Sequence, residues 1–140
     1  VRHLDGRCSL RKGRIAVQGD LKLCCIGLRE LQELPDLRSV EGDLWATKDW
    51  GQKASLKALP EGLHVGGNLS LEGCFTLAAL PEGIHVGGDL GLYGCSALAA
   101  LPEGLHVGGG LDLRGCSALA ALPEGIHVGG DLGLYGCSAL

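Results

Sequence analysis

Aromatic side chains and long apolar runs are both scarce in this chain of 140 residues. It has two Trp, two Tyr and one Phe, so its core cannot be built around aromatic rings. No window holds the roughly 18 consecutive apolar residues that a transmembrane helix requires, so we expect no membrane partner. Val1–Arg14 has no apolar run after its charges, so we expect no signal peptide in it.

Basic residues are scarce in the later part of the chain. Residues 59–140 contain one Lys or Arg, Arg114, and eight Asp or Glu, for a net charge of −7 with histidine neutral. Residues 1–58 contain 11 Lys or Arg and eight Asp or Glu, for a net charge of +3. Nucleic-acid recognition needs a stripe of basic residues with aromatic rings for stacking. We therefore expect no nucleic-acid partner.

Leucine and glycine are abundant. Leu occupies 28 of the 140 positions and hydrophobic residues make up 46%, so the chain can bury a core and wholesale disorder is excluded. The 25 glycines favour many tight turns around small, similar layers.

A period of 21 residues organises the later half. Four prolines recur at this spacing, and so do four cysteines, in the unit L-P-E-G-[LI]-H-V-G-G-x-L-x-L-x-G-C-x-x-L-A-A. Leu77–Leu98 returns unchanged as Leu119–Leu140. Val17–Leu21 and Val40–Leu44 are degenerate upstream copies, so the chain reads as one repeat array. We divide it into an N-terminal segment or partial repeat (1–14), irregular repeats (15–58, with an insert at 45–57) and regular repeats (59–140).

The string L-x-L-x-G-C-x-x-L-x-x-L-P-E-G-[LI] in Leu90–Leu105 resembles leucine-rich repeats of a short, Cys-containing kind. Its Leu-Pro element is similar to repeats of secreted bacterial effectors, and its Gly-Cys element to those of plant immune receptors. The resemblance implies a scaffold whose exposed sheet face binds proteins. One departure is a glycine where the family has a leucine, three residues before the first strand leucine (Gly66, Gly87, Gly108 and Gly129).

The repeat predicts a solenoid with little or no α-helix. Each L-x-L places two leucines on the inner side of a strand, and stacked coils align these strands into a parallel sheet at about 4.8 Å spacing. The return side is too short for a regular helix, so we expect turns, 3-10 or extended segments there. Pro and Gly close each coil, and Gly-Gly bends the chain toward the next strand.

The cysteine column is predicted to be structural. Its members, 21 residues apart, fall at the turn after each strand, where a buried thiol packs and donates to a carbonyl. A zinc site needs ligands at closer spacing in the sequence. Disulfides between neighbouring coils are geometrically possible. The odd total of seven cysteines favours reduced thiols and therefore a reducing compartment. We expect this reducing compartment to be the cytoplasm of a bacterium, or the cytoplasm of a host cell if the protein is a secreted effector. These structural thiols are Cys74, Cys95, Cys116 and Cys137.

A histidine also recurs once in each unit. A functional interpretation is a metal-binding or pH-sensing strip, and the alternative is a solvated position copied by duplication. The column joins the exposed sheet face if the strand runs straight through Gly-Gly, and it lies round a corner if Gly-Gly breaks the strand. We predict no metal site, and the role of the column stays open (His64, His85, His106 and His127).

Partner-binding residues are predicted on the exposed side of the L-x-L strands. Trp, Tyr and Arg are frequent binding anchors, although aromatic residues also favour strands for structural reasons alone. The predicted contacts are Trp45, Glu72, Asp89, Tyr93, Asp112, Arg114, Asp131 and Tyr135.

No catalytic site is predicted. Ser96, Ser117 and Ser138 have no base placed beside them by sequence, and no Gly-rich loop ends in Lys-Ser/Thr. We therefore expect no enzyme activity and no cofactor, and predict a protein–protein interaction module. Two alternatives are the substrate-recognition part of a larger secreted effector with a ubiquitin-ligase domain, and a solenoid that self-associates head to tail through its oppositely charged halves.

Overall fold

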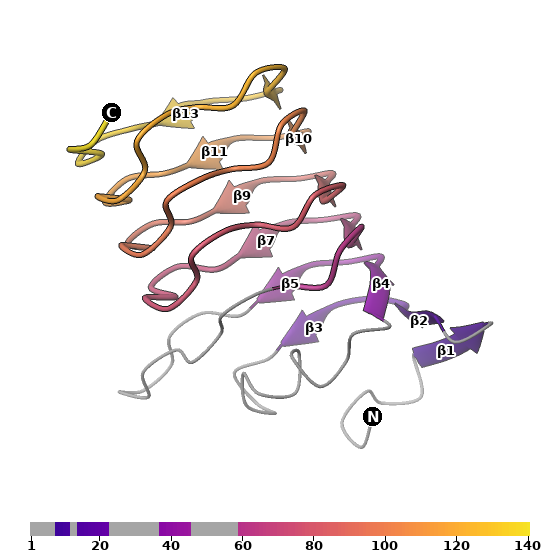
Figure 1. Cartoon of the computed structure of the whole chain (residues 1–140). Helices are drawn as coiled ribbons and strands as arrows, with labels where there is room; N and C mark the ends of the chain where they lie inside the picture. The colour runs from indigo at the N-terminus through magenta and orange to yellow at the C-terminus, as the bar shows by residue number, and fades with distance from the viewer. Residues whose placement is uncertain (1–7, 12–13, 23–36, 46–58) are drawn as a thin grey trace.

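The computed structural model of this chain describes residues 8–11, 14–22, 37–45 and 59–140. Within these ranges the chain is a solenoid of short strands and turns, without a helix (Figure 1). The predicted repeat solenoid with a parallel sheet is therefore confirmed. No helix in the described ranges is long and apolar enough to cross a membrane. Most of the predicted insert at 45–57, including Trp50, lies outside the described residues, as do Cys24 and Cys25.

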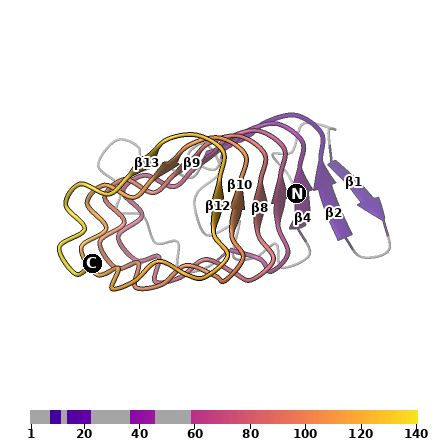
Figure 2. The same ribbon diagram turned by 90° about the horizontal axis from the view of Figure 1, so that it is seen from above.

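Each regular coil contributes two short strands, and each strand joins a different sheet. The first, which we call the histidine sheet, contains the His-Val pairs of the regular coils. Its strands lie side by side in Figure 2, and all pair in parallel except β1 with β2. They are β1 (Cys8–Arg11), β2 (Arg14–Val17), β4 (Leu37–Val40), β6 (His64–Val65), β8 (His85–Val86), β10 (His106–Val107) and β12 (His127–Val128).

The second sheet, which we call the leucine sheet, contains the first leucine of each L-x-L. It has six strands, and every pairing between them is parallel, so that Leu90 lies opposite Leu69 on one side and Leu111 on the other. The strands are β3 (Leu21–Lys22), β5 (Leu44–Trp45), β7 (Leu69–Ser70), β9 (Leu90–Gly91), β11 (Leu111–Asp112) and β13 (Leu132–Gly133).

Gly-Gly forms the corner between the two sheets. A Cβ placed on Gly87 would lie 2.5 Å from the carbonyl oxygen of Gly66 in the preceding coil, so neighbouring coils are too close here for any side chain. The Gly87 N–H donates to the Val65 carbonyl at 2.8 Å. This close approach explains the glycine where the resembled family has leucine. Each strand that carries a histidine ends before Gly-Gly. The histidine column therefore lies round the corner from the leucine sheet, on the other sheet.

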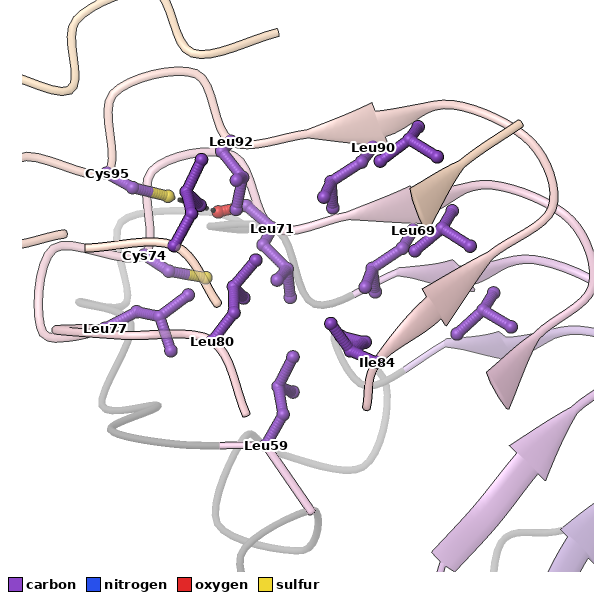
Figure 3. Close-up of a cluster of buried hydrophobic side chains, with 14 of the residues drawn as sticks. Leu59, Leu69, Leu71, Cys74, Leu77, Leu80, Ile84, Leu90, Leu92 and Cys95 are labelled. Carbon is purple, nitrogen blue, oxygen red and sulfur yellow. Dashed lines mark hydrogen bonds between the residues drawn. The ribbon is translucent and has the colours of Figure 1, made fainter. Parts of the chain in front are cut away.

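The core is a continuous stack of inward leucines. Leu90 and Leu92 are both 0% exposed, as the L-x-L pattern predicts, and they pack on Leu69 and Leu71 of the coil before (Figure 3). Burying a leucine side chain contributes about 1.5–3 kcal/mol. Because each coil covers the leucines of the next, this stabilisation is shared along the array.

The cysteine column runs through this core at the turn that follows each leucine strand. All four thiols are buried and reduced, and those of Cys95, Cys116 and Cys137 each donate to a carbonyl of the preceding coil. The Sγ of Cys95 lies 3.1 Å from the Leu71 oxygen (Figure 3), and the equivalent distances for Cys116 and Cys137 are 3.2 and 3.0 Å. Burial raises the pKa of Cys74 to about 11 and the pKa of Cys95 and Cys116 to about 12.

Candidate interaction surface

The outer face of the leucine sheet carries three columns of outward residues, one member of each column in each coil. The aspartate column precedes the first strand leucine (Asp20, Asp43, Asn68, Asp89, Gly110 and Asp131). The middle column lies between the two leucines and includes Trp45, Ser70, Gly91, Asp112 and Gly133. The outer column follows the second leucine (Glu72, Tyr93, Arg114 and Tyr135).

The aspartate column is a hydrogen-bond ladder between coils. From Asp20 to Asp89, the Oδ1 of each side chain accepts the backbone N–H of the equivalent residue in the next coil. Asp43 accepts from Asn68 at 2.7 Å, and Asn68 accepts from Asp89 at 2.8 Å. Asp89 accepts from Gly110 at 2.7 Å, so this predicted partner contact also ties two coils together. The sequence signal was an Asp or Asn recurring just before each strand.

The ladder is interrupted at Gly110, which has no side chain to continue it. In the part of the chain that the structure describes, no protein group accepts the N–H of Asp131. Asp131 itself is exposed. The fifth coil of the ladder therefore has no side-chain acceptor for the backbone N–H of Asp131 in the sixth.

Asp112, Arg114 and Tyr93 form one connected group at the centre of the face. The guanidinium of Arg114 donates to both carboxylate oxygens of Asp112, at 2.9 and 2.8 Å. Its Cζ lies 5.4 Å from the ring centroid of Tyr93, within range of a cation–π contact. The hydrogen bond from Arg114 lowers the pKa of Asp112, and the same bond raises the pKa of Arg114.

The glycines of the middle column give these long side chains room. A Cβ on Gly133 would lie 3.3 Å from Cγ of Arg114, and one on Gly91 would lie 3.4 Å from Oε1 of Glu72. The side chains of Arg114 and Glu72 therefore approach the glycine of a neighbouring coil. The alternation of Gly and Asp in this column sets where the Asp112–Arg114 pair can lie.

An open groove of about 780 Å³ crosses this face. Five of the predicted contacts line it: Glu72, Asp89, Asp112, Arg114 and Asp131. Tyr93 lies outside this lining, and its ring contacts Arg114, which is part of it. Four carboxylates against one guanidinium give the groove an acidic character.

The remaining predicted contacts lie outside the groove. Tyr135 is 87% exposed and follows Arg114 in the outer column, whereas Tyr93 is 52% exposed. Trp45 is half-buried on β5, opposite Ser70 of β7, which lines the groove. The structure thus brings together six of the eight predicted residues, with Tyr93 joined through its contact with Arg114, and it places Tyr135 and Trp45 beside them.

The histidine column lies on the outside of the histidine sheet, away from this face. Its rings are stacked, with centroid separations of 4.3 Å for His64–His85, 4.8 Å for His85–His106 and 4.7 Å for His106–His127. Partial burial lowers the pKa of His85, and the charges of His64 and His106 lower it further. Among the described residues no three His, Cys, Asp or Glu side chains form a group that could hold a metal ion.

Three comparisons with known proteins leave the arrangement to be interpreted from its own geometry. Neither the family models, nor the curated proteins, nor the solved structures searched gave a match to this chain.

Proposed function

We propose that this protein binds a protein partner through the outer face of the leucine sheet. The observation that carries the proposal is the open groove lined by Arg114, whose guanidinium contacts the exposed ring of Tyr93, with the exposed ring of Tyr135 in the following coil. Tyrosine and arginine are enriched at protein interfaces and among the residues that dominate binding energy. This face is also the surface that the leucine-rich-repeat resemblance predicts for binding.

The charge of the face favours a basic partner. Glu72, Asp89 and Asp131 are exposed carboxylates along the groove, and the one guanidinium there is already paired with Asp112. Complementary charge accelerates encounter and disfavours acidic competitors. We therefore propose that the bound segment carries a net positive charge.

A binding role without catalysis agrees with the chemistry of the thiols. Cysteine acts as a nucleophile in its thiolate form, and pKa values near 11 to 12 keep Cys74, Cys95 and Cys116 protonated at neutral pH. The same reduced column supports a reducing compartment. We propose the cytoplasm, either of a bacterium or of a host cell that receives a secreted effector.

The test uses linear peptides selected from a display library on the immobilised protein. We expect the selected peptides to be basic and to lose about tenfold or more in affinity for the double variant Tyr93→Ala/Tyr135→Ala. Phe75→Ala is the matched control, because Phe75 is also an exposed aromatic, at 41%, but lies in the turn beyond the strand. Equal affinity for wild type and the tyrosine variant would overturn the proposal.

A further inference from the structure

Gly110 interrupts a ladder that is otherwise regular. In the coils before it, an Asp or Asn oxygen from one coil accepts the N–H of the next, at distances of 2.7 to 2.8 Å. At Gly110 the acceptor is missing, and the N–H of Asp131 has no protein partner within the described residues. An acceptor supplied from outside could bond to this N–H.

The space for such an acceptor opens into the groove. A Cβ placed on Gly67, Gly88 or Gly109 would collide with the ladder oxygen of the preceding coil, but the three atoms nearest to one on Gly130 are backbone atoms of Gly109 and Gly110. The volume that a ladder side chain fills elsewhere is therefore open here. Gly109, Gly110 and Gly130 all line the groove.

Asn68 shows which chemical group fits this position. It lies between Asp43 and Asp89 in the ladder, as Gly110 lies between Asp89 and Asp131, and its Oδ1 accepts the Asp89 N–H at 2.8 Å. A carboxylate at position 110 would lie between the carboxylates of Asp89 and Asp131 and would be repelled by both. A side-chain amide is neutral and avoids this repulsion. A side-chain amide also has two N–H donors that the neighbouring carboxylates can accept.

We propose that the partner places an asparagine or glutamine side chain at Gly110. The amide oxygen accepts the N–H of Asp131, and the amide nitrogen faces the carboxylates of Asp89 and Asp131. The ligand thereby completes the ladder, and the rest of its segment lies in the acidic groove. This inference rests on the proposed function and adds a specificity position to it.

Amide NMR on isotope-labelled protein tests the inference without a partner. The probe is the N-acetyl, N-methylamide derivative of asparagine, with the aspartate and leucine derivatives as controls. We expect the asparagine probe alone to shift the Asp131 amide resonance saturably. Gly110→Asn should abolish the shift, because its own side chain occupies the site. Ala118→Asn should retain it, because it adds the same side chain to the same unit at an exposed position outside the groove.

The display-selected peptides provide the second measurement. We expect Asn or Gln at a fixed position, and an affinity about tenfold weaker for Gly110→Asn than for wild type or Ala118→Asn. An Asp131 shift that persists in Gly110→Asn, or that the aspartate probe produces equally, would overturn the inference. Peptides that lose affinity for the tyrosine variant but bind Gly110→Asn normally would overturn it while leaving the proposed function standing.

Discussion

The imidazole rings of His106 and His127 are stacked, with centroids 4.7 Å apart and planes 2° from parallel. Their register is that of the strands β10 and β12, in which each histidine lies opposite its equivalent. A charged imidazole in this column therefore always has another imidazole as its neighbour. Stacking stabilises the coils while the rings are neutral, and repulsion opposes it once they are protonated.

The first prediction concerns acid. Because the pKa of His85 is lowered in the folded state, the unfolded chain binds more protons below its ordinary value of 6.5. The contribution of neutral His85 to the free energy of unfolding is fully present above pH 6.5. It is lost as the pH falls through the pKa that His85 has in the folded state. We expect urea midpoints to fall less between about pH 7.5 and about pH 5.5 in His85→Ser than in wild type. Ser39 occupies this position opposite His64, so serine fits the column. Identical pH profiles would contradict the prediction.

The second prediction concerns the interrupted ladder. Gly110→Asn should raise the free energy of unfolding by about 0.5–1.5 kcal/mol, because it adds one hydrogen bond between coils. Gly110 does not have a positive φ, and a Cβ there would lie 3.2 Å from the Asp131 oxygen, so a small adjustment admits the side chain. Asp89→Ala should lower the stability by a similar amount. Urea denaturation measures both, and a destabilised Gly110→Asn would count against the ladder.

The third prediction separates two reasons for glycine. Gly87→Ala brings a Cβ against the Gly66 carbonyl and should cost about 1–3 kcal/mol or more, as overpacking does. At Gly104 nothing lies within 4 Å of an added Cβ, but φ is +67°, so Gly104→Ala should cost about 1–2 kcal/mol from backbone strain. Thermal and urea unfolding of the two variants compare these costs. A Gly87→Ala protein as stable as wild type would show that the coils are not in contact at this corner.

The fourth prediction concerns thiol reactivity. Burial and the raised pKa values of Cys74, Cys95 and Cys116 should protect the column from an aromatic disulfide reagent at neutral pH. We expect at least four thiols to react slowly in the native protein and all seven to react at once in denaturant. Rapid native labelling of all seven would be incompatible with the described core.

The period of 21 residues was sufficient to predict the solenoid and the inward leucines. Leu90 and Leu92 could be placed because strand alternation is a local property. The histidine sheet could not be predicted, because alternation continues unbroken from Val86 through Gly88 to Leu90 in the sequence. The corner depends instead on the distance between Gly66 and Gly87, which belong to different coils.

The candidate site was predictable in its position and less so in its chemistry. Alternation along the strand predicted that Tyr93 and Arg114 point outward, and the structure places their side chains in contact. The role of Asp89 was missed, because its hydrogen-bond partner is a backbone N–H 21 residues away. The sequence pattern alone does not show that the backbone N–H of Asp131 lacks an acceptor. The cause is that Gly110, one coil before it, has no side chain.

The bonds between regular coils always join the same positions of successive units. The number of units can therefore change without changing the contacts of each unit. Removing or duplicating one whole unit would reconnect every strand, thiol and ladder bond to an equivalent partner. Variants with extra units could therefore extend the outer face in fixed steps while keeping the same cross-section. An interruption such as Gly110 would travel with its unit, so recombination could change the number and separation of amide-accepting positions without redesigning the fold.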